Sequence, residues 1–264
     1  MLQLNNLYKT FNKGTVNENN LYRGLSLSVN DGDFITIIGG NGAGKSTLLN
    51  LVSGKIDPDE GSIFLGGSDI THMPEFRKAR SIARVFQDPS KGTCPSMTIL
   101  ENMSLAYNKG KIYGLSRGAS KKQTGLFSEL VSQIGIGLED KLHTKVSLLS
   151  GGQRQALSLI MSTMTSPELL LLDEHTAALD PKTSEVIINL TEKIVTEKKI
   201  TTLMVTHNMN HAMKMGNRLL MMQRGRIAID ICGEEKQELT QDKLLSMFEK
   251  AGCEDEVSDR MLLA

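Results

Sequence analysis

One stretch of eight residues, 39–46 with the sequence GGNGAGKS, constrains the fold of this chain more than any other. Its spacing fits the phosphate-binding loop G-x-x-x-x-G-K-S. The apolar run Phe34–Ile38 before it is typical of a strand covered on both faces, and residues 45–53 after it predict a helix that ends at Gly54. A strand, a glycine-rich turn and a helix in this order place backbone N–H groups around phosphate oxygens. A plain turn with an exposed lysine is the alternative, and the flanking strand and helix disfavour it.

The loop residues have distinct expected roles. The motif indicates that Lys45 contacts the β- and γ-phosphates and that the hydroxyl of Ser46 binds Mg²⁺. The other residues expected to bind the nucleotide through this loop are Gly39, Asn41, Gly42, Ala43, Gly44 and Thr47.

The rest of the chain predicts an α/β fold. Residues 2–7 look like an edge strand, residues 25–29 alternate as a half-buried strand does, and these leading strands look antiparallel. Further strands at 63–65, 81–86, 169–172 and 202–206 are separated by helices, which favours a mostly parallel sheet. A hairpin is expected at 219–230, turning at Arg224-Gly225, and an amphipathic helix at 239–250. Residues 98–165 are mostly helical in pattern and predict an inserted helical subdomain, in which one helix carries Leu126, Phe127, Leu130, Val131 and Ile134.

Composition excludes several classes of protein. Lys and Arg together number 30 and so do Asp and Glu, so the chain has no long-range attraction to nucleic acid or anionic lipid. No apolar run approaches the ~18 residues that a membrane-spanning helix needs. The first six residues lack the pattern of a signal peptide. Cys94, Cys232 and Cys253 show neither metal spacing nor a disulfide framework, which favours a reducing cytosol.

Two carboxylates follow the buried strand 169–172. Asp173 and Glu174 lie just past its C-terminal end, which is where ligands bind in an open α/β sheet. Asp173 is expected to hold the metal and Glu174 to deprotonate the attacking water. An acidic helix cap is the alternative interpretation, and the nearby phosphate loop makes it much weaker.

A second anion-binding helix start lies at residues 149–153, with the sequence LSGGQ. Ser150 is expected to cap the helix, and the two glycines expose N–H groups. Together with the phosphate loop and the Asp173-Glu174 pair, this string resembles the signature of the ABC (ATP-binding cassette) ATPases. Further motifs of that family follow in order: Gln87 matches the glutamine loop, Ala178-Leu179-Asp180 the D-loop and His207 the switch histidine.

The resemblance covers about residues 1–232 and implies a P-loop NTPase core with a helical insertion at about 87–165, leaving 233–264 as a short helical extension. It implies ATP and Mg²⁺ as cofactors, with Glu174, His207 and Gln87 catalytic and with Ser46, Gln87 and Asp173 near the metal. Phe11 is the expected adenine-stacking residue, although Tyr8 or Tyr22 could serve. In a head-to-tail homodimer, the residues expected to reach the partner's ATP are Ser150, Gly151, Gly152, Gln153 and Asp180.

What ATP hydrolysis drives is less constrained by the residues. The resemblance is to the separate ATPase subunits of bacterial uptake systems, which implies membrane permease subunits, indirectly an extracytoplasmic binding protein, no nucleic acid, and a cytoplasmic place on the inner face of the membrane. A docking groove would involve residues 87–108, including Pro95, Met97, Ile99 and Met103, unless these form an ordinary core. Residues 173–180 and 230–248 resemble a bacterial uptake subgroup found beside lipoprotein-type binding proteins, which implies amino acids, aromatic ones included, as the substrate class. An ATPase of iron–sulfur assembly is the alternative, and a zinc site at His207 and His211 is a further one, which lacks a third ligand.

Overall fold

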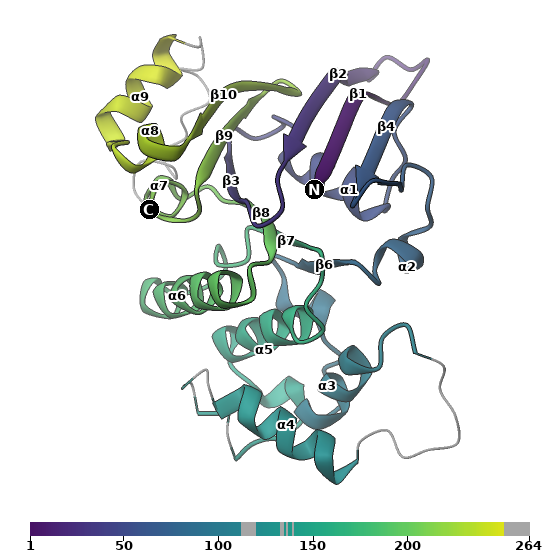
Figure 1. Cartoon of the computed structure of the whole chain (residues 1–264), viewed down its shortest axis with the longest axis vertical. Helices are drawn as coiled ribbons and strands as arrows, with labels where there is room; N and C mark the ends of the chain where they lie inside the picture. Colours follow the sequence, from purple (N-terminus) through teal and green to yellow (C-terminus); the bar gives the residue numbers. More distant parts are fainter. Residues whose placement is uncertain (112–119, 133–134, 136, 139, 251–264) are drawn as a thin grey trace.

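The computed structural model of the chain describes residues 1–111, 120–132, 135, 137–138 and 140–250 (Figure 1). One of its sheets is antiparallel and has the order β2-β1-β4-β5. Its strands are β1 (Leu2–Phe11), β2 (Asn19–Val29), β4 (Glu60–Leu65) and β5 (Ser68–Asp69). This is the antiparallel layer that the sequence predicted. The expectation of an edge strand at residues 2–7 was wrong, because β4 pairs with the free side of β1.

The second sheet has the order β10-β9-β3-β8-β7-β6, and every pair except β10 with β9 is parallel. Its strands are β3 (Phe34–Ile38), β6 (Ile82–Val85), β7 (Leu169–Asp173), β8 (Thr201–Val205), β9 (Arg218–Gln223) and β10 (Arg226–Cys232). Every residue of β3 and β8 is buried, as strands covered on both faces require. The mostly parallel sheet is therefore confirmed, and so is the hairpin that turns at Arg224-Gly225.

Helix α1 (Lys45–Ser53) joins the two sheets. Its Leu48, Leu49 and Val52 pack in one cluster with residues of both, such as Leu4 and Ile37. On the other face of the large sheet, α5 (Gly151–Thr163) and α6 (Pro181–Lys198) contribute to a separate cluster. The strands that carry the expected site residues at their ends therefore lie between α1 on one face of the large sheet and α5 and α6 on the other.

The helical insertion forms a group at one end of the molecule (Figure 1). It consists of α3 (Ile99–Tyr107), α4 (Lys121–Ser132), α5 and the 3₁₀ turns η1 (Pro89–Gly92) and η2 (Val146–Leu148). Phe127 and Val131 are buried in its own core, as expected, whereas Leu126 is exposed, and Ile134 lies outside the described residues. Ile99 and Met103 also belong to this core, so they are not free to line a docking groove.

The C-terminal part continues the core instead of leaving it. Helix α7 (Met209–Lys214), α8 (Gly233–Gln237) and α9 (Gln241–Lys250) lie beside the β9–β10 hairpin, and α9 buries Leu244 and Phe248 against Met221. The buried Lys236 donates to the carbonyl of Gly216 at 3.1 Å, which anchors α8. Cys253 and the rest of 251–264 lie outside the described residues. Over the described part of the chain, no helix combines the length and the apolarity that a membrane crossing requires.

Three short elements were not predicted, namely β5, α2 (Glu75–Lys78) and α7.

Candidate active site

The phosphate loop is wedged between two strands. Gly39 has a φ of 148°, and a Cβ there would lie 2.2 Å from the carbonyl oxygen of Met222 on β9. Gly44 has a φ of 107°, and a Cβ there would lie 2.9 Å from the ring of Tyr22 on β2. Both positions therefore require glycine for its backbone conformation and for its small size.

Lys45 is fixed inside this loop. Its side chain is buried, and its ammonium donates to the carbonyls of Gly39 at 2.6 Å and Gly40 at 2.9 Å. The positive charge is thus held where the loop curves, at the start of α1. A cavity of about 270 Å³ opens over it and is lined by Phe11, Asn19, Leu21, Asn41, Gly42, Gly44, Lys45, Ser46, Thr47, Glu174 and His207. Sequence-predicted residues from four separate segments therefore share one cavity.

The aromatic residues near this cavity differ in what they can do. Phe11, at the end of β1, lines it. Tyr22 is buried, its hydroxyl donates to the carbonyl of Gly44 at 2.6 Å, and burial raises the pKa of that hydroxyl. The Tyr22 ring therefore packs against the phosphate loop, and neither face of the ring is free to stack on an adenine base. Tyr8 does not line the cavity, so Phe11 has the best position for stacking.

Asp173 lies beside Ser46, as expected. The Ser46 hydroxyl donates to Asp173 Oδ1 at 3.3 Å, and the other carboxylate oxygen accepts from the Arg84 guanidinium at 2.5 Å. Hydroxyl and carboxylate oxygens are donors that suit Mg²⁺, so this pair fits the metal that the sequence implied. Arg84 also donates to Asn50 Oδ1 at 2.7 Å. The sequence interpretation overlooked Arg84, although a charge in the middle of an otherwise apolar strand was a signal.

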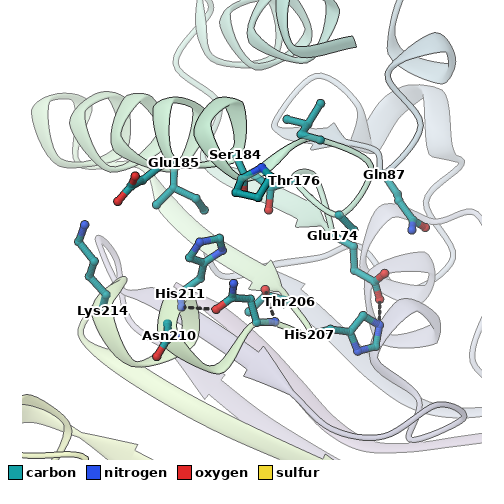
Figure 2. Close-up of a pocket in the computed structure, with 15 residues that line it drawn as sticks. Gln87, Glu174, Thr176, Ser184, Glu185, Thr206, His207, Asn210, His211 and Lys214 are labelled. Atoms are coloured by element: carbon teal, nitrogen blue, oxygen red, sulfur yellow. Dashed lines mark hydrogen bonds and ion pairs between the residues drawn. The ribbon is translucent and has the colours of Figure 1, made fainter. Parts of the chain in front are cut away.

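Glu174 and His207 meet at the mouth of the phosphate cavity. Glu174 Oε1 lies 2.5 Å from His207 Nε2, because β7 and β8 are neighbours and each residue lies just beyond the end of its strand (Figure 2). The Glu174 backbone has a φ of 48°, and its N–H donates to the carbonyl of Val205 at 3.0 Å. That hydrogen bond holds an unfavourable backbone conformation, which is typical of residues positioned for function.

A second, larger cavity of about 890 Å³ shares Glu174 and His207 with the first. Gln87 lies on its wall, across from His207 and on the same side as Glu174 in Figure 2. The loop after β7 also lines this cavity, through Thr176, Ala177 and Leu179. Gln87 is thus beside the two expected catalytic side chains, but it does not line the phosphate cavity itself.

The signature residues form a helix start, as predicted. Ser150 caps α5, its side chain accepts from the N–H of Gln153 at 3.2 Å, and the Gln153 side chain accepts from the N–H of Ser150 at 3.2 Å. This reciprocal pair is a capping box. None of Ser150, Gly151, Gly152 and Gln153 lines either of the two cavities of this chain.

Asp180 caps α6, immediately beside the signature. Its carboxylate accepts from the N–H of Thr183 at 3.1 Å, and hydrogen bonds from the Thr183 side chain and N–H hold the Asp180 pKa below its usual range. A Cβ on Gly152 would lie 2.1 Å from Cγ2 of Thr183. The first turns of α5 and α6 are therefore in direct contact, and Gly152 is required for that contact as well.

The remaining histidines do not make a zinc site. His207 pairs with Glu174, whereas the buried His175 contacts Thr191 Oγ1 through Nε2 at 3.1 Å. Burial, with a smaller effect of His211, lowers the pKa of His175 to about 3. Throughout the described residues there is no group of three or more His, Cys, Asp or Glu side chains that could hold a metal. The structural role of His175 in the core could not be read from its place in the motif.

Comparison with known proteins gives a consistent result. Residues 22–177 match the protein family described as ABC transporter. The chain is 51% identical over 251 residues to the tyrosine transport ATP-binding protein of Clostridioides difficile strain R20291, covering 95% of this chain and all of that one. It is 33% identical to a phosphonates import ATP-binding protein of Ruegeria sp. strain TM1040, over 97% of each chain. Its fold matches a dimeric ATP-binding cassette in a post-hydrolysis state bound to ADP and Pi, with a TM-score of 0.74, 27% identity, and coverage of 88% and 98%.

Proposed function

Because the chain belongs to the ABC transporter family, we propose that it is the ATP-hydrolysing subunit of a bacterial importer for an aromatic amino acid. ATP hydrolysis that drives transport is the activity of this family. The relative that is 51% identical along 95% of this chain is named for tyrosine transport, which supports the substrate class. The observation that carries the catalytic part is the pairing of Glu174 with His207 at the mouth of the phosphate cavity.

We assign the chemistry to six side chains. Lys45 and the loop N–H groups bind the β- and γ-phosphates, and Glu174 takes a proton from the water that attacks the γ-phosphorus. His207 donates from Nε2, which now contacts Glu174, and can turn the same N–H toward the γ-phosphate. Mg²⁺, held by Ser46 and Asp173 and approached by Gln87, would supply positive charge opposite the phosphate oxygens.

The second half of each site is proposed to come from a partner copy. The Ser150-capped helix start offers free N–H groups and a positive dipole end, yet it lines neither cavity of its own chain. An anion-binding helix start of this kind fits the exposed side of a partner's γ-phosphate, with Asp180 nearby. The dimeric cassette of similar fold supports this arrangement.

The partners and location follow from the same proposal. Permease subunits in the membrane would receive the motion, an extracytoplasmic binding protein would deliver the substrate, and the chain would lie on the inner face of the membrane. Two exposed apolar side chains suit permease docking: Phe76 on α2 is 66% exposed and Leu105 on α3 is 47% exposed. They replace Ile99 and Met103, which are buried.

The Glu174→Gln variant tests the catalytic assignment. It should bind ATP with unchanged affinity and lose at least 100-fold of the turnover, because an amide cannot accept the water's proton, and removal of a general base costs about 10²–10⁴ in rate. Turnover is measured by phosphate release, and affinity by titration with a fluorescent nucleotide. Turnover within threefold of the parent would remove Glu174 from the mechanism.

Expression with and without the neighbouring permease genes tests the transport part. We expect the chain to co-purify with a membrane protein and a Phe76→Ser plus Leu105→Ser variant to lose that association while keeping its ATPase activity. Recovery of the chain with iron–sulfur assembly proteins instead would favour the alternative function.

A further inference from the structure

A third cavity, of about 640 Å³, lies between β2 and the β9–β10 hairpin and shares no residue with the two cavities of the active site. We call it the arginine pocket. The tips of β2 and of the hairpin lie side by side at the top of Figure 1. Its lining consists of Asn20, Arg23, Gln223, Arg224, Arg226, Ile227 and Ala228. Three guanidinium groups and two side-chain amides thus line one concavity, and no carboxylate does.

The three arginines differ from the other arginines of the sheet. Arg218 is held by two hydrogen bonds to Asp230, and Arg84 by Asp173. For Arg23, Arg224 and Arg226, in contrast, no carboxylate within the described ranges forms an ion pair with the guanidinium. Three like charges around one hollow repel one another, so the arrangement favours any anion that enters.

Arg224 occupies a position that suits other residues better. Gln223 pairs with Arg226, so Arg224-Gly225 is a two-residue hairpin turn. Both turn residues have positive φ, 45° for Arg224 and 75° for Gly225, which defines a turn that favours Asn-Gly. An arginine here strains the backbone without helping the turn. Arg224 lines the pocket, and the strain points to a use for its side chain there.

The turn is also fixed in place. The Gly225 N–H donates to the carbonyl of Ala43 at 3.0 Å, and a Cβ at Gly225 would lie 1.7 Å from the carbonyl oxygen of Leu21. The hairpin tip is therefore clamped between β2 and the phosphate loop. The backbone around Arg224 and Arg226 is therefore already in place before a ligand binds, and only the exposed side chains have to be ordered.

We propose that the arginine pocket binds a small solute carrying two or more phosphate groups, at a site separate from the phosphate loop. Guanidinium groups bind phosphate oxygens through paired hydrogen bonds, and three of them match the charge of a di- or triphosphate. Asn20 and Gln223 contribute polar side chains to the lining, while Ile227 and Ala228 contribute apolar surface. The volume is within the range of ligand cavities. A solute fits this concave site better than a lipid headgroup at a membrane surface.

The test uses the full-length chain with Lys45→Ala, so that the phosphate loop does not compete, and inorganic tripolyphosphate as the probe in isothermal titration calorimetry. We expect one saturable site per chain. Arg226→Gln should weaken it at least tenfold, and so should Arg224→Asn, which keeps the turn because asparagine favours this conformation. Arg77→Gln, on the exposed face of α2, is the matched control and should stay within twofold.

Two results would overturn the proposal. One is the absence of saturable binding at millimolar tripolyphosphate, and the other is binding by Arg224→Asn and Arg226→Gln within twofold of the parent. ADP titration in chains with Lys45 intact checks that both variants remain folded, and their affinity for ADP should be unchanged. Flotation with phosphatidylglycerol vesicles distinguishes a soluble phosphate compound from a lipid headgroup as the ligand. Flotation that depends on Arg224 and Arg226, without tripolyphosphate binding, would also contradict the proposal.

Discussion

Arg84 shows how a single buried charge can organise a catalytic edge. It lies on β6, its guanidinium binds one oxygen of Asp173, and only the other oxygen faces Ser46. The side chains of Arg84 and Asp173 are only 11% and 14% exposed, so water screens the pair poorly. Arg84 is therefore a positioning residue for Asp173, not a ligand of the nucleotide.

Arg84→Met should lower the free energy of unfolding by about 1.5–3 kcal/mol, because it leaves a half-buried carboxylate without its charged hydrogen-bond partner. Urea unfolding followed by circular dichroism measures the loss. Arg84→Lys keeps the charge but not the fork that reaches both Asp173 and Asn50, and it should lose roughly half as much. Equal stability of the methionine variant and the parent would show that the ion pair contributes nothing.

His175 makes stability depend on pH. Its pKa is lowered to about 3 in the folded chain, from about 6.5 when unfolded. Between these values the unfolded chain binds one more proton than the folded chain, so stability is complete above pH 6.5 and falls as the pH drops toward 3. The fall from this one group is about 1.4 kcal/mol for each pH unit.

His175→Asn should remove this part of the pH dependence. We expect the parent to lose more stability than the variant between pH 7 and pH 5, as measured by urea unfolding at each pH. The stability of the variant at pH 7 gives the cost of the lost Thr191 contact and of the smaller buried side chain, which is subtracted from the values at lower pH. Parallel pH profiles for the two chains would assign the dependence to other groups, such as His211.

At the scale of single elements, the ends of helices were predicted best where a capping residue or a glycine marks the end of the segment. Gly54 ends α1 and Asp180-Pro181 begins α6, as expected from their caps alone. The errors concern what covers a segment. Residues 2–7 were expected at an edge because β4, some 50 residues later, cannot be inferred as their neighbour from their own pattern. For the same reason Leu126 was expected inside and Ile99 was a candidate for a surface groove.

The capping box of α5 separates two roles of Ser150. Aspartate is as good an N-cap as serine and favours the positive end of the helix dipole, so Ser150→Asp should keep thermal stability within about 0.5 kcal/mol. A carboxylate facing a partner's γ-phosphate should nevertheless abolish most ATPase activity. Calorimetry and phosphate release measure the two effects. Full activity in a stable Ser150→Asp chain would limit Ser150 to capping.

At the scale of the whole molecule, the order of the motifs predicted which residues share the site, but it did not predict which of their side chains are in contact. The contact of Glu174 with His207 depends on β7 and β8 being neighbours, and Arg84 reaches Asp173 because β6 is next to β7. The roles in a partner's site were inferred from the resemblance and remain predictions, since they depend on a second copy.

Mixing two inactive chains tests the shared site. Lys45→Ala and Ser150→Asp homodimers each lack one half of both sites and should be nearly inactive. In a heterodimer, one site carries both changes and the other carries neither, so mixing should restore activity, up to about a quarter of the parent rate if one site suffices. The parent's rate per chain should also rise with protein concentration. A constant rate from nanomolar to high micromolar protein, with only monomers seen when Glu174→Gln binds ATP, would exclude a shared site.

The contact between Gly152 and Thr183 has a consequence for timing. The backbone from Glu174 to Asp180 begins at the expected general base and ends at the cap of α6, whose first turn touches the first turn of α5. Because a Cβ on Gly152 would lie only 2.1 Å from Cγ2 of Thr183, the two turns are packed closely, and a movement of the α5 turn toward α6 pushes on the α6 turn. If the signature binds a partner's nucleotide as proposed, a push of that nucleotide on α5 would reach the α6 cap. From there it would pass along the seven residues 174–180 to the proposed general base of the chain's own site. Hydrolysis at the two sites of a dimer would then be coupled in time, because a change at one site would alter the position of the general base at the other.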